Sequence, residues 1–132
     1  MTEIRLEHVS YAYGQERILE DINLQVTSGE VVSILGPSGV GKTTLFNLIA
    51  GILEVQSGRI VLDGEENPKG RVSYMLQKDL LLEHKTVLGN IILPLLIQKV
   101  DKAEAIARAD EILAAFQLTA VRDKYPHELS GG

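Results

Sequence analysis

Cysteine is absent from the 132 residues of this chain, as are basic blocks and long apolar runs. Without cysteine, the chain cannot form disulfides or thiolate metal sites. The longest nearly apolar run, 91-IILPLLI-97, is far shorter than the roughly 18 residues that indicate a transmembrane helix. The N-terminal residues contain no apolar stretch of the kind found in signal peptides, so we expect a cytoplasmic protein.

The overall charge argues against a nucleic-acid partner. Lys and Arg total 13 against 18 Asp and Glu, which gives a net charge of −5 at pH 7. Proteins that wrap nucleic acid neutralise its phosphates with clustered Lys and Arg, and the sequence contains no such cluster. A hydrophobic content of 45% and a charged content of 23% are typical of a globular domain.

Several short segments have the patterns of β-strands. In 18-ILEDINLQV-26, apolar residues alternate with polar ones, which predicts a strand with one face exposed to water. The run 31-VVSIL-35 is apolar on both faces, which is typical of a strand buried inside a parallel sheet. Further strands are expected at 59-RIVL-62, which lies between two turn signals, and at 71-RVSYML-76.

Helical patterns occupy the middle and the second half of the chain. The segment 45-LFNLIA-50 predicts a short helix that stops at Gly51. From Thr86 onward the pattern is helical throughout. Gly89 and Pro94 are expected to break or kink the first helix of this block.

The next helix has the clearest signals. Asp101 can cap its N-terminus, and Glu104 would complete a capping box. The apolar residues on one face are Ile106, Ala109, Leu113 and Phe116. The change of pattern near residue 85 predicts a mixed α/β region over residues 1–85 and a helical region over residues 86–132.

A glycine-rich stretch, 36-GPSGVGKTT-44, lies between a predicted strand and a predicted helix. It fits the pattern G-x-x-x-x-G-K-[ST] of the P-loop, which binds nucleotide phosphates. Gly36, Gly39 and Gly41 let the chain curl so that backbone N–H groups surround a phosphate without interference from a Cβ atom. The positive end of the following helix would point at the same anion.

The polar side chains of this stretch have separate predicted tasks. Lys42 would place a point charge between the β- and γ-phosphates of a nucleoside triphosphate. The hydroxyl of Thr43 can ligate Mg²⁺, and Thr44 is placed to reach the α-phosphate. Ser38, inside the loop, is counted with them as a nucleotide-binding residue.

The chain resembles a known family, the nucleotide-binding subunits of ATP-binding cassette (ABC) transporters. The glycine-rich stretch is similar to the Walker A motif of that family, and 9-VSYAYG-14 is similar to its aromatic A-loop. The resemblance implies that Tyr13 stacks on adenine, with Tyr11 as the alternative stacking residue. A further alternative is that both tyrosines only pack within the β region. It also implies an α/β P-loop NTPase fold, with an N-terminal antiparallel β subdomain and the start of an α-helical subdomain.

Two later positions match the family in its expected order. Gln77 matches the Q-loop glutamine, which in the family contacts Mg²⁺ and the attacking water. The tetrapeptide 129-LSGG-132 matches the start of the family's signature motif. The resemblance implies that Ser130 and the backbone of Gly131 and Gly132 meet the γ-phosphate of ATP held by the Walker A motif of a partner.

The resemblance implies an ATP-hydrolysing, energy-coupling subunit that uses ATP and Mg²⁺. Lys42 and Gln77 would be its catalytic residues, and Thr43 and Gln77 would hold the metal. The implied partners are a second ATP-binding subunit, transmembrane permease subunits and a solute-binding protein, at the inner face of the cell membrane. Within the family, 74-YMLQKDLLLEHKTVLGNIILPL-95 is most similar to ATPases of importers for small solutes such as nitrate, sulfonates and taurine.

The sequence departs from the family pattern because it ends at Gly132. The family's Walker B aspartate, its adjoining glutamate, the D-loop and the switch histidine all come later in a complete cassette. We therefore expect an incomplete cassette that binds Mg-nucleotide weakly and hydrolyses it negligibly by itself. We also expect the run 31-VVSIL-35 to expose an unpaired apolar edge, because the family places the Walker B strand beside it.

Two other functions are compatible with parts of the sequence. The string GPSGVGKTT also resembles the phosphate-binding loop of guanylate kinases, and phosphorylation of a nucleoside monophosphate would test that alternative. About 30 residues of β pattern precede the loop here, whereas those kinases begin with the loop strand. The remaining alternative is an ABC ATPase that transports nothing, and such proteins usually carry long insertions or paired cassettes.

Overall fold

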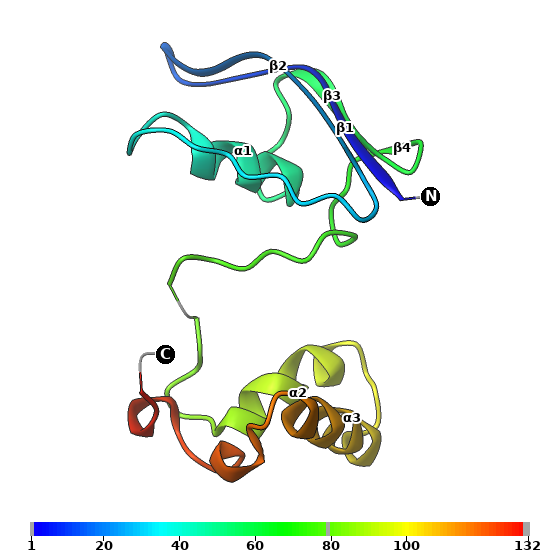
Figure 1. The fold of residues 1–132 in the computed structure, drawn as a ribbon, viewed down its shortest axis with the longest axis vertical. Coiled ribbons are helices and arrows are strands. Elements are labelled where there is room, and N and C mark those ends of the chain that lie inside the picture. Colours follow the sequence, from blue (N-terminus) through cyan, green and yellow to red (C-terminus); the bar gives the residue numbers. More distant parts are fainter. Residues whose placement is uncertain (1, 79, 131–132) are drawn as a thin grey trace. The chain divides into compact units, whose positions relative to one another are not determined.

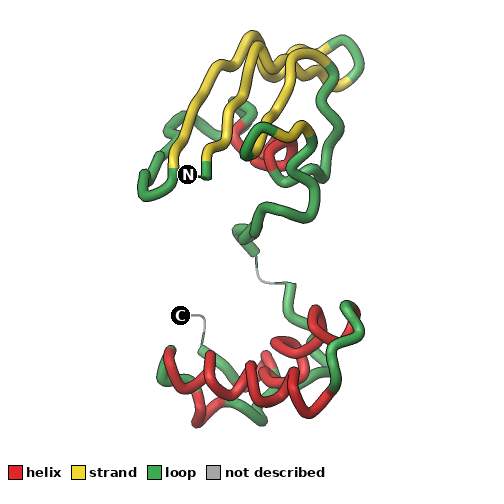
Figure 2. The backbone as a smooth tube through the Cα atoms, turned by 90° about the vertical axis from the view of Figure 1, so that its right-hand side faces the viewer, coloured by secondary structure: helices red, strands yellow, loops and turns green. Residues whose placement is uncertain are grey.

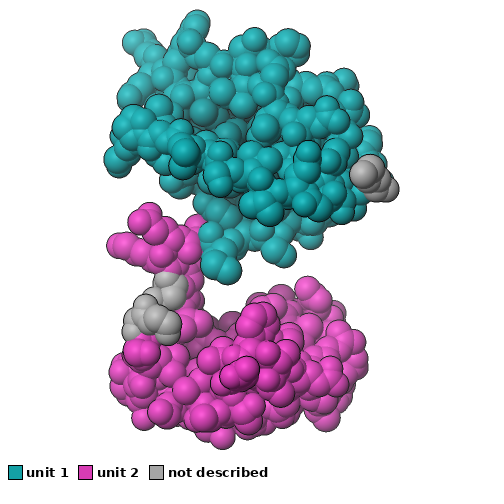
Figure 3. Space-filling view, in the orientation of Figure 1, with its two compact units in different colours: residues 1–75 teal, residues 76–132 magenta. Residues whose placement is uncertain are grey.

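The computed structural model describes residues 2–78 and 80–130. The chain divides into two compact units, Met1–Met75 (unit 1) and Leu76–Gly132 (unit 2), which Figure 3 colours teal and magenta. Unit 1 contains all the strands that the structure describes and one helix, and unit 2 is helical. Among the described residues, no helix combines the length and the apolar character that crossing a membrane requires.

Unit 1 is built on a four-stranded antiparallel sheet, drawn in yellow in Figure 2. In the order of the sheet, its strands are β2 (Glu16–Thr27), β1 (Glu3–Tyr13), β3 (Ser57–Leu62) and β4 (Glu65–Glu66). The predicted alternation is confirmed along β2, where the apolar positions between residues 22 and 26 are half-buried and the polar positions between them are exposed. The antiparallel β region expected near the N-terminus is therefore present.

Strand β3 approaches β1 very closely at one glycine. Gly58 has a φ of +79°, and a Cβ atom built on it would lie 2.2 Å from the carbonyl oxygen of His8. Only glycine fits this position, because any side chain would overlap the backbone of β1 and adopt a disfavoured φ. The register between the two strands shifts at the same place, between Glu7 and Ser10.

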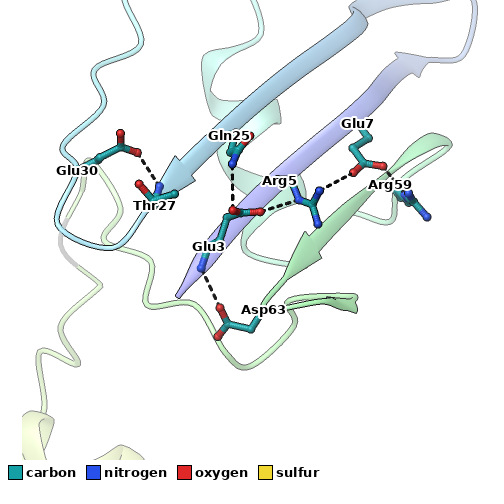
Figure 4. Close-up of polar contacts among 8 residues, drawn as sticks. All are labelled: Glu3, Arg5, Glu7, Gln25, Thr27, Glu30, Arg59 and Asp63. Atoms are coloured by element: carbon teal, nitrogen blue, oxygen red, sulfur yellow. Dashed lines mark hydrogen bonds and ion pairs between the residues drawn. The ribbon is translucent and has the colours of Figure 1, made fainter. Parts of the chain in front are cut away.

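A row of charged and polar side chains covers one side of the sheet (Figure 4). Arg5 lies 2.7 Å from Glu3 and 3.7 Å from Glu7, and the second oxygen of Glu7 accepts a hydrogen bond from Arg59 at 2.5 Å. The hydrogen bond from Arg59 lowers the pKa of Glu7 below its ordinary value. Gln25 extends the row by donating to Glu3 at 3.0 Å. These contacts join β2, β1 and β3 across the ladder.

The helix α1 (Lys42–Ile49) lies against the sheet (Figure 1), and its apolar residues pack on the sheet. Leu45 and Leu48 are buried on this helix, and the helix ends at Ala50 before Gly51, whose φ is +70°. The predicted helix and its glycine stop are thus confirmed. The buried cluster that joins the helix to the sheet consists of Leu6, Val9, Leu19, Leu45, Leu48 and Ile60.

Two predicted strands are absent from the structure. The segment 31–35 has no strand structure, and Val31 and Leu35 are 95% and 90% exposed. The segment 71–76 is likewise irregular, although Tyr74 packs against Phe46 with ring centroids 6.5 Å apart. A strand needs a partner for its backbone N–H and C=O groups, and no described segment pairs with either run. The predictions of strands at 31–35 and 71–76 were therefore wrong, whereas the strand predicted at 59–62 is part of β3.

Unit 2 contains the helices α2 (Val87–Ile97) and α3 (Lys102–Ala115), followed by the short 3₁₀ turns η1 (Thr119–Val121) and η2 (Pro126–Glu128). A buried cluster of Ile92, Ala105 and Ala109 holds α2 and α3 together. Gly89 and Pro94 lie inside α2, and neither ends it. Packing against α3 outweighs the low helix propensity of these two residues.

The start of α3 matches its predicted cap. Asp101 accepts a hydrogen bond from the backbone N–H of Ala103 at 2.9 Å. Glu104 does not close the expected capping box, because its carboxylate pairs with Arg108 one turn later. Phe116 was predicted on the buried face, but it lies just after the helix and is 72% exposed. The buried face of α3 therefore ends at Leu113.

Candidate functional site

The glycine-rich loop over residues 36–41 leads directly into α1. Gly41 stands at the N-cap with a φ of +104°, in the left-handed region, and makes no side-chain cap. A Cβ atom on Gly41 would lie 2.8 Å from Cγ2 of Ile18 and 3.1 Å from Cδ2 of Leu19, both on β2. A glycine is required here, because the start of α1 is pressed against the sheet.

The first N–H groups of α1 are available for an external acceptor. The first intrahelical bond runs from the N–H of Leu45 to the carbonyl of Gly41, at 2.9 Å. The N–H groups of Lys42, Thr43 and Thr44 precede it and have no partner within the helix. These donors and the positive end of the helix dipole make this end of α1 an anion-binding position.

Lys42 lies across the loop. Its ammonium group donates to the carbonyl oxygens of Gly36 and Pro37, each at 2.6 Å. The loop is curled tightly enough that a Cβ atom on Gly36 would lie 3.0 Å from Cγ1 of Val40. The positive charge is therefore held on the carbonyls at the start of the loop that leads into α1.

The hydroxyl side chains of the loop differ in accessibility. Ser38 and Thr43 are exposed, whereas Thr44 is only 8% exposed. Hollows of about 350 and 460 Å³ also occur in unit 1, but they are lined by other residues than those of the loop. The candidate site is therefore a backbone cradle on an exposed loop and not a deep pocket.

The two candidate tyrosines near the end of β1 have different surroundings. Tyr11 is half-buried and packs against the apolar core of unit 1. Tyr13 is 50% exposed, and its ring stands edge-on to that of Tyr11, with centroids 5.1 Å apart and planes at 79°. Tyr13 is therefore the one with ring surface free for stacking, whereas Tyr11 supports it from the core.

The other predicted site residues belong to unit 2. Gln77 is exposed at a bend that follows the irregular segment 71–76. Ser130 is exposed, and the N–H of Leu129 before it donates to the carbonyl of Pro126 at 3.0 Å. Gly131 and Gly132 lie outside the described residues. Among residues 2–78 and 80–130, no three His, Cys, Asp or Glu side chains gather closely enough to hold a metal ion by themselves.

The segment that leads to Ser130 is anchored by residues that sequence reasoning missed. Arg122 donates to both carboxylate oxygens of Asp110 on α3, at 2.6 and 3.2 Å, and this hydrogen bonding lowers the pKa of Asp110. The carbonyls of Lys124 and Arg122 accept from the N–H groups of Val87 and Leu88 at the start of α2. No local sequence signal could have found this pairing, because the partners lie far apart in the chain.

Comparison with known proteins decides the family. A family model described as "ABC transporter" matches residues 19–132. The chain belongs to the ABC transporter family. Its fold is accordingly that of an ABC ATPase domain in part: a P-loop, an antiparallel β sheet and the helices that follow.

Curated relatives match this family member along almost its whole length. It is 41% identical to the spermidine/putrescine import ATP-binding protein PotA of Aggregatibacter actinomycetemcomitans, with 98% of this chain and 36% of that protein covered. It is 39% identical to the sulfate/thiosulfate import ATP-binding protein CysA of Thermosynechococcus vestitus, with 98% and 40% covered. The chain thus spans little more than a third of the length of these relatives.

Solved structures of ABC cassettes have the same fold. An ATP-binding cassette of an ABC transporter, MJ1267, matches with a TM-score of 0.83 and 27% identity, over 99% of this chain and 60% of that one. The cassette MJ0796, solved as a dimer bound to ADP and Pi, matches with a TM-score of 0.77 and 28% identity, over 97% and 63%. The expected fold class is therefore confirmed.

Proposed function

We propose that this chain is the ATP-binding, energy-coupling part of an ABC importer. The observation that carries the proposal is the glycine loop that opens α1 and whose carbonyls hold the Lys42 ammonium, in a chain that belongs to the ABC family. The relatives named for import of spermidine/putrescine and of sulfate/thiosulfate are nearly equally identical to this chain. Sequence identity therefore does not favour either solute for it. We propose a small solute of the nitrate, sulfonate or taurine kind, from the similarity of residues 74–95 to such importers.

The loop and α1 would hold the triphosphate of ATP. The backbone N–H groups of the loop and of the first turn of α1 would donate to phosphate oxygens, with Gly36, Gly39 and Gly41 leaving room for them. Lys42 would give up its two contacts with carbonyl oxygens and bind the β- and γ-phosphates instead. Its positive charge would there stabilise the negative charge on the phosphate oxygens during phosphoryl transfer. Thr44 would reach the α-phosphate, and Ser38 would also contact the bound nucleotide.

Mg²⁺ is the metal that we propose for the bound nucleotide. The described residues offer no carboxylate cluster, and Mg²⁺ is commonly held by substrate phosphates, water and one or two protein ligands. Thr43, exposed in the first turn of α1, and Gln77 would be those ligands. The bound ion would neutralise phosphate charge. Gln77 would also orient the attacking water.

The remaining roles concern adenine and the partners. Tyr13 would stack on the adenine ring, and Ser130, Gly131 and Gly132 would meet the γ-phosphate of ATP bound to a second cassette. We assign residues 1–85 to the β subdomain and the first part of the ATPase core, and residues 86–132 to the helical subdomain. We propose that the cassette dimer works on the inner face of the membrane with permease subunits and a solute-binding protein, and that it takes no nucleic-acid partner.

The decisive experiment is ATP binding by the Lys42→Ala variant. Removing a charged hydrogen-bond donor to phosphate should weaken ATP binding by about 10- to 100-fold, measured by titration calorimetry on the purified full chain. Lys102→Ala, an exposed lysine at the start of α3, is the matched control and should bind like the wild type. Equal ATP affinity in Lys42→Ala and wild type would contradict the proposal.

A further inference from the structure

One side chain from outside the predicted site completes the end of strand β1. The amide of Gln56 accepts a hydrogen bond from the N–H of Ala12 at 2.9 Å and donates one to the carbonyl of Ala12 at 3.0 Å. Gln56 thus satisfies both backbone groups of a residue 44 positions away. A backbone partner in a sheet makes the same pair of bonds, so the side chain stands in for one more residue of a neighbouring strand.

This contact falls where the real neighbouring strand stops. The last backbone pair between β1 and β3 is Ser10 with Ser57, and Gln56 is the residue immediately before β3. Beyond this pair, β1 continues to Tyr13 with β2 as its backbone neighbour on one side. The close approach of β3 at Gly58 brings Gln56 within reach of Ala12.

The residue that Gln56 holds lies between the two tyrosines. Tyr11 is packed into the core, and the exposed ring of Tyr13 leans edge-on against it. The turn after Tyr13 begins at Gly14, whose φ is +59°. Without the two bonds to Ala12, the last residues of β1 would be held on one side by β2 alone, and the direction of the Tyr13 ring would be less well defined.

We propose that Gln56 is a positioning residue for nucleotide binding, and that it acts by holding Ala12 so that Tyr13 presents its ring to the base. This inference rests on the proposed function, in which Tyr13 stacks on adenine. Gln56 touches neither the base nor the phosphates; it limits the conformations of the strand end, so less order has to be gained when the base binds.

The test is a double-mutant cycle on the purified full chain, with two ligands. ATP binding is measured by titration calorimetry for wild type, Gln56→Leu, Tyr13→Ala and the double variant, and inorganic triphosphate, which has no base, is titrated in parallel. Gln25→Leu is the matched control, because Gln25 is also a strand glutamine but its amide meets a side chain, that of Glu3. Gln56→Asn, which keeps the amide on a shorter stem, replaces Gln56→Leu if that variant does not fold.

We expect Tyr13→Ala to weaken ATP binding by about fivefold to 100-fold, as loss of base stacking does. Gln56→Leu should weaken it by about twofold to tenfold, the range for loss of an ordinary hydrogen bond. In the Tyr13→Ala background, Gln56→Leu should have no further effect. Affinity for inorganic triphosphate should stay within twofold of wild type in every variant.

Three kinds of outcome would overturn the inference, and they separate failure of the positioning role from failure of the proposed stacking role. If Gln56→Leu weakens triphosphate as much as ATP, or weakens ATP equally in the presence and absence of Tyr13, its effect is general destabilisation. If Tyr13→Ala weakens ATP binding and Gln56→Leu does not, the stacking role stands and the positioning role falls. If Tyr13→Ala itself leaves ATP binding unchanged, the proposed stacking role fails, and the positioning role fails with it.

Discussion

Two short apolar segments of unit 1, 31-VVSIL-35 and 59-RIVL-62, have similar compositions and different structures. The second forms most of β3, between β1 and β4, and its Ile60, Val61 and Leu62 are buried. The first follows β2 after the turn over residues 27–30, and it is irregular and largely exposed. Both are rich in β-branched residues, so intrinsic propensity does not separate them.

The difference between the segments lies in their hydrogen-bonding partners. The 59–62 segment has the edge of β1 on one side and its own hairpin with β4 on the other. For the 31–35 segment, no described residue offers a matching edge. The turn before it makes its hydrogen bonds internally. The Thr27 N–H donates to the Glu30 carboxylate at 2.6 Å (Figure 4), and the Glu30 N–H donates to the Thr27 carbonyl at 3.0 Å. Apolar composition thus indicates a strand only where the chain also supplies a partner.

The largest expected effect is the loss of stability when the buried Ile60 is truncated, and the same truncation at the exposed Val31 is its comparison. Ile60→Ala should destabilise the 132-residue chain by about 2–5 kcal/mol, because Ile60 is 2% exposed within the core cluster. Val31→Ala should change the free energy of unfolding by less than about 0.5 kcal/mol, since Val31 is 95% exposed. Chemical denaturation measures both. A loss at Val31 as large as that at Ile60 would show that segment 31–35 is packed in solution.

The second prediction concerns the close approach that allows β3 to pair. Gly58→Ala should destabilise the chain by about 2–4 kcal/mol, because it adds both a disfavoured φ and an overlap with the backbone of His8. Gly64→Ala is the matched control: its φ is +83°, but a Cβ atom there meets nothing within 4 Å, so about 1–2 kcal/mol is expected. Equal losses in denaturant unfolding would mean that the approach of β3 to β1 is looser than the structure has it.

The smallest expected effect is a pH dependence of the pairing between β1 and β3. The hydrogen bond from Arg59 lowers the pKa of Glu7 below its ordinary value of 4.5 in the folded chain. A carboxylate with a lowered folded pKa stabilises the fold above its unfolded pKa, and this contribution is lost as the pH falls through the folded pKa. The stability difference between wild type and Glu7→Gln should therefore shrink on acidification from pH 7 to pH 3, measured by urea unfolding.

The control for this pH dependence is Glu54→Gln, at an exposed carboxylate outside the ion pair. Its stability difference from wild type should not follow the profile of Glu7→Gln. A difference between wild type and Glu7→Gln that stays constant over the whole pH range would contradict the coupling of Glu7 to Arg59. Because these groups are exposed, the effect should also weaken as salt is added.

Local sequence signals predicted the parts of the molecule whose interactions are local. Asp101 caps α3 through the N–H two residues later, and the glycine stop at Gly51 ends α1. The run 36–44 predicted a glycine curl that opens a helix, and the structure has that curl and that helix. Prediction failed at Phe116 and at segments 31–35 and 71–76, where burial depends on residues distant in the chain.

By itself, the sequence determined the phosphate-binding pattern, the Asp101 cap of α3, the glycine stop of α1 and the family to which the chain belongs. Each of these depends on residues within a few positions of one another, or on their order along the chain. Only the tertiary structure decided that 59–62 pairs and 31–35 does not, that Tyr11 packs in the core while Tyr13 stays exposed, and that Gln56 holds Ala12. These features depend on which backbone edges and side chains meet across long stretches of chain, and no local pattern encodes such meetings.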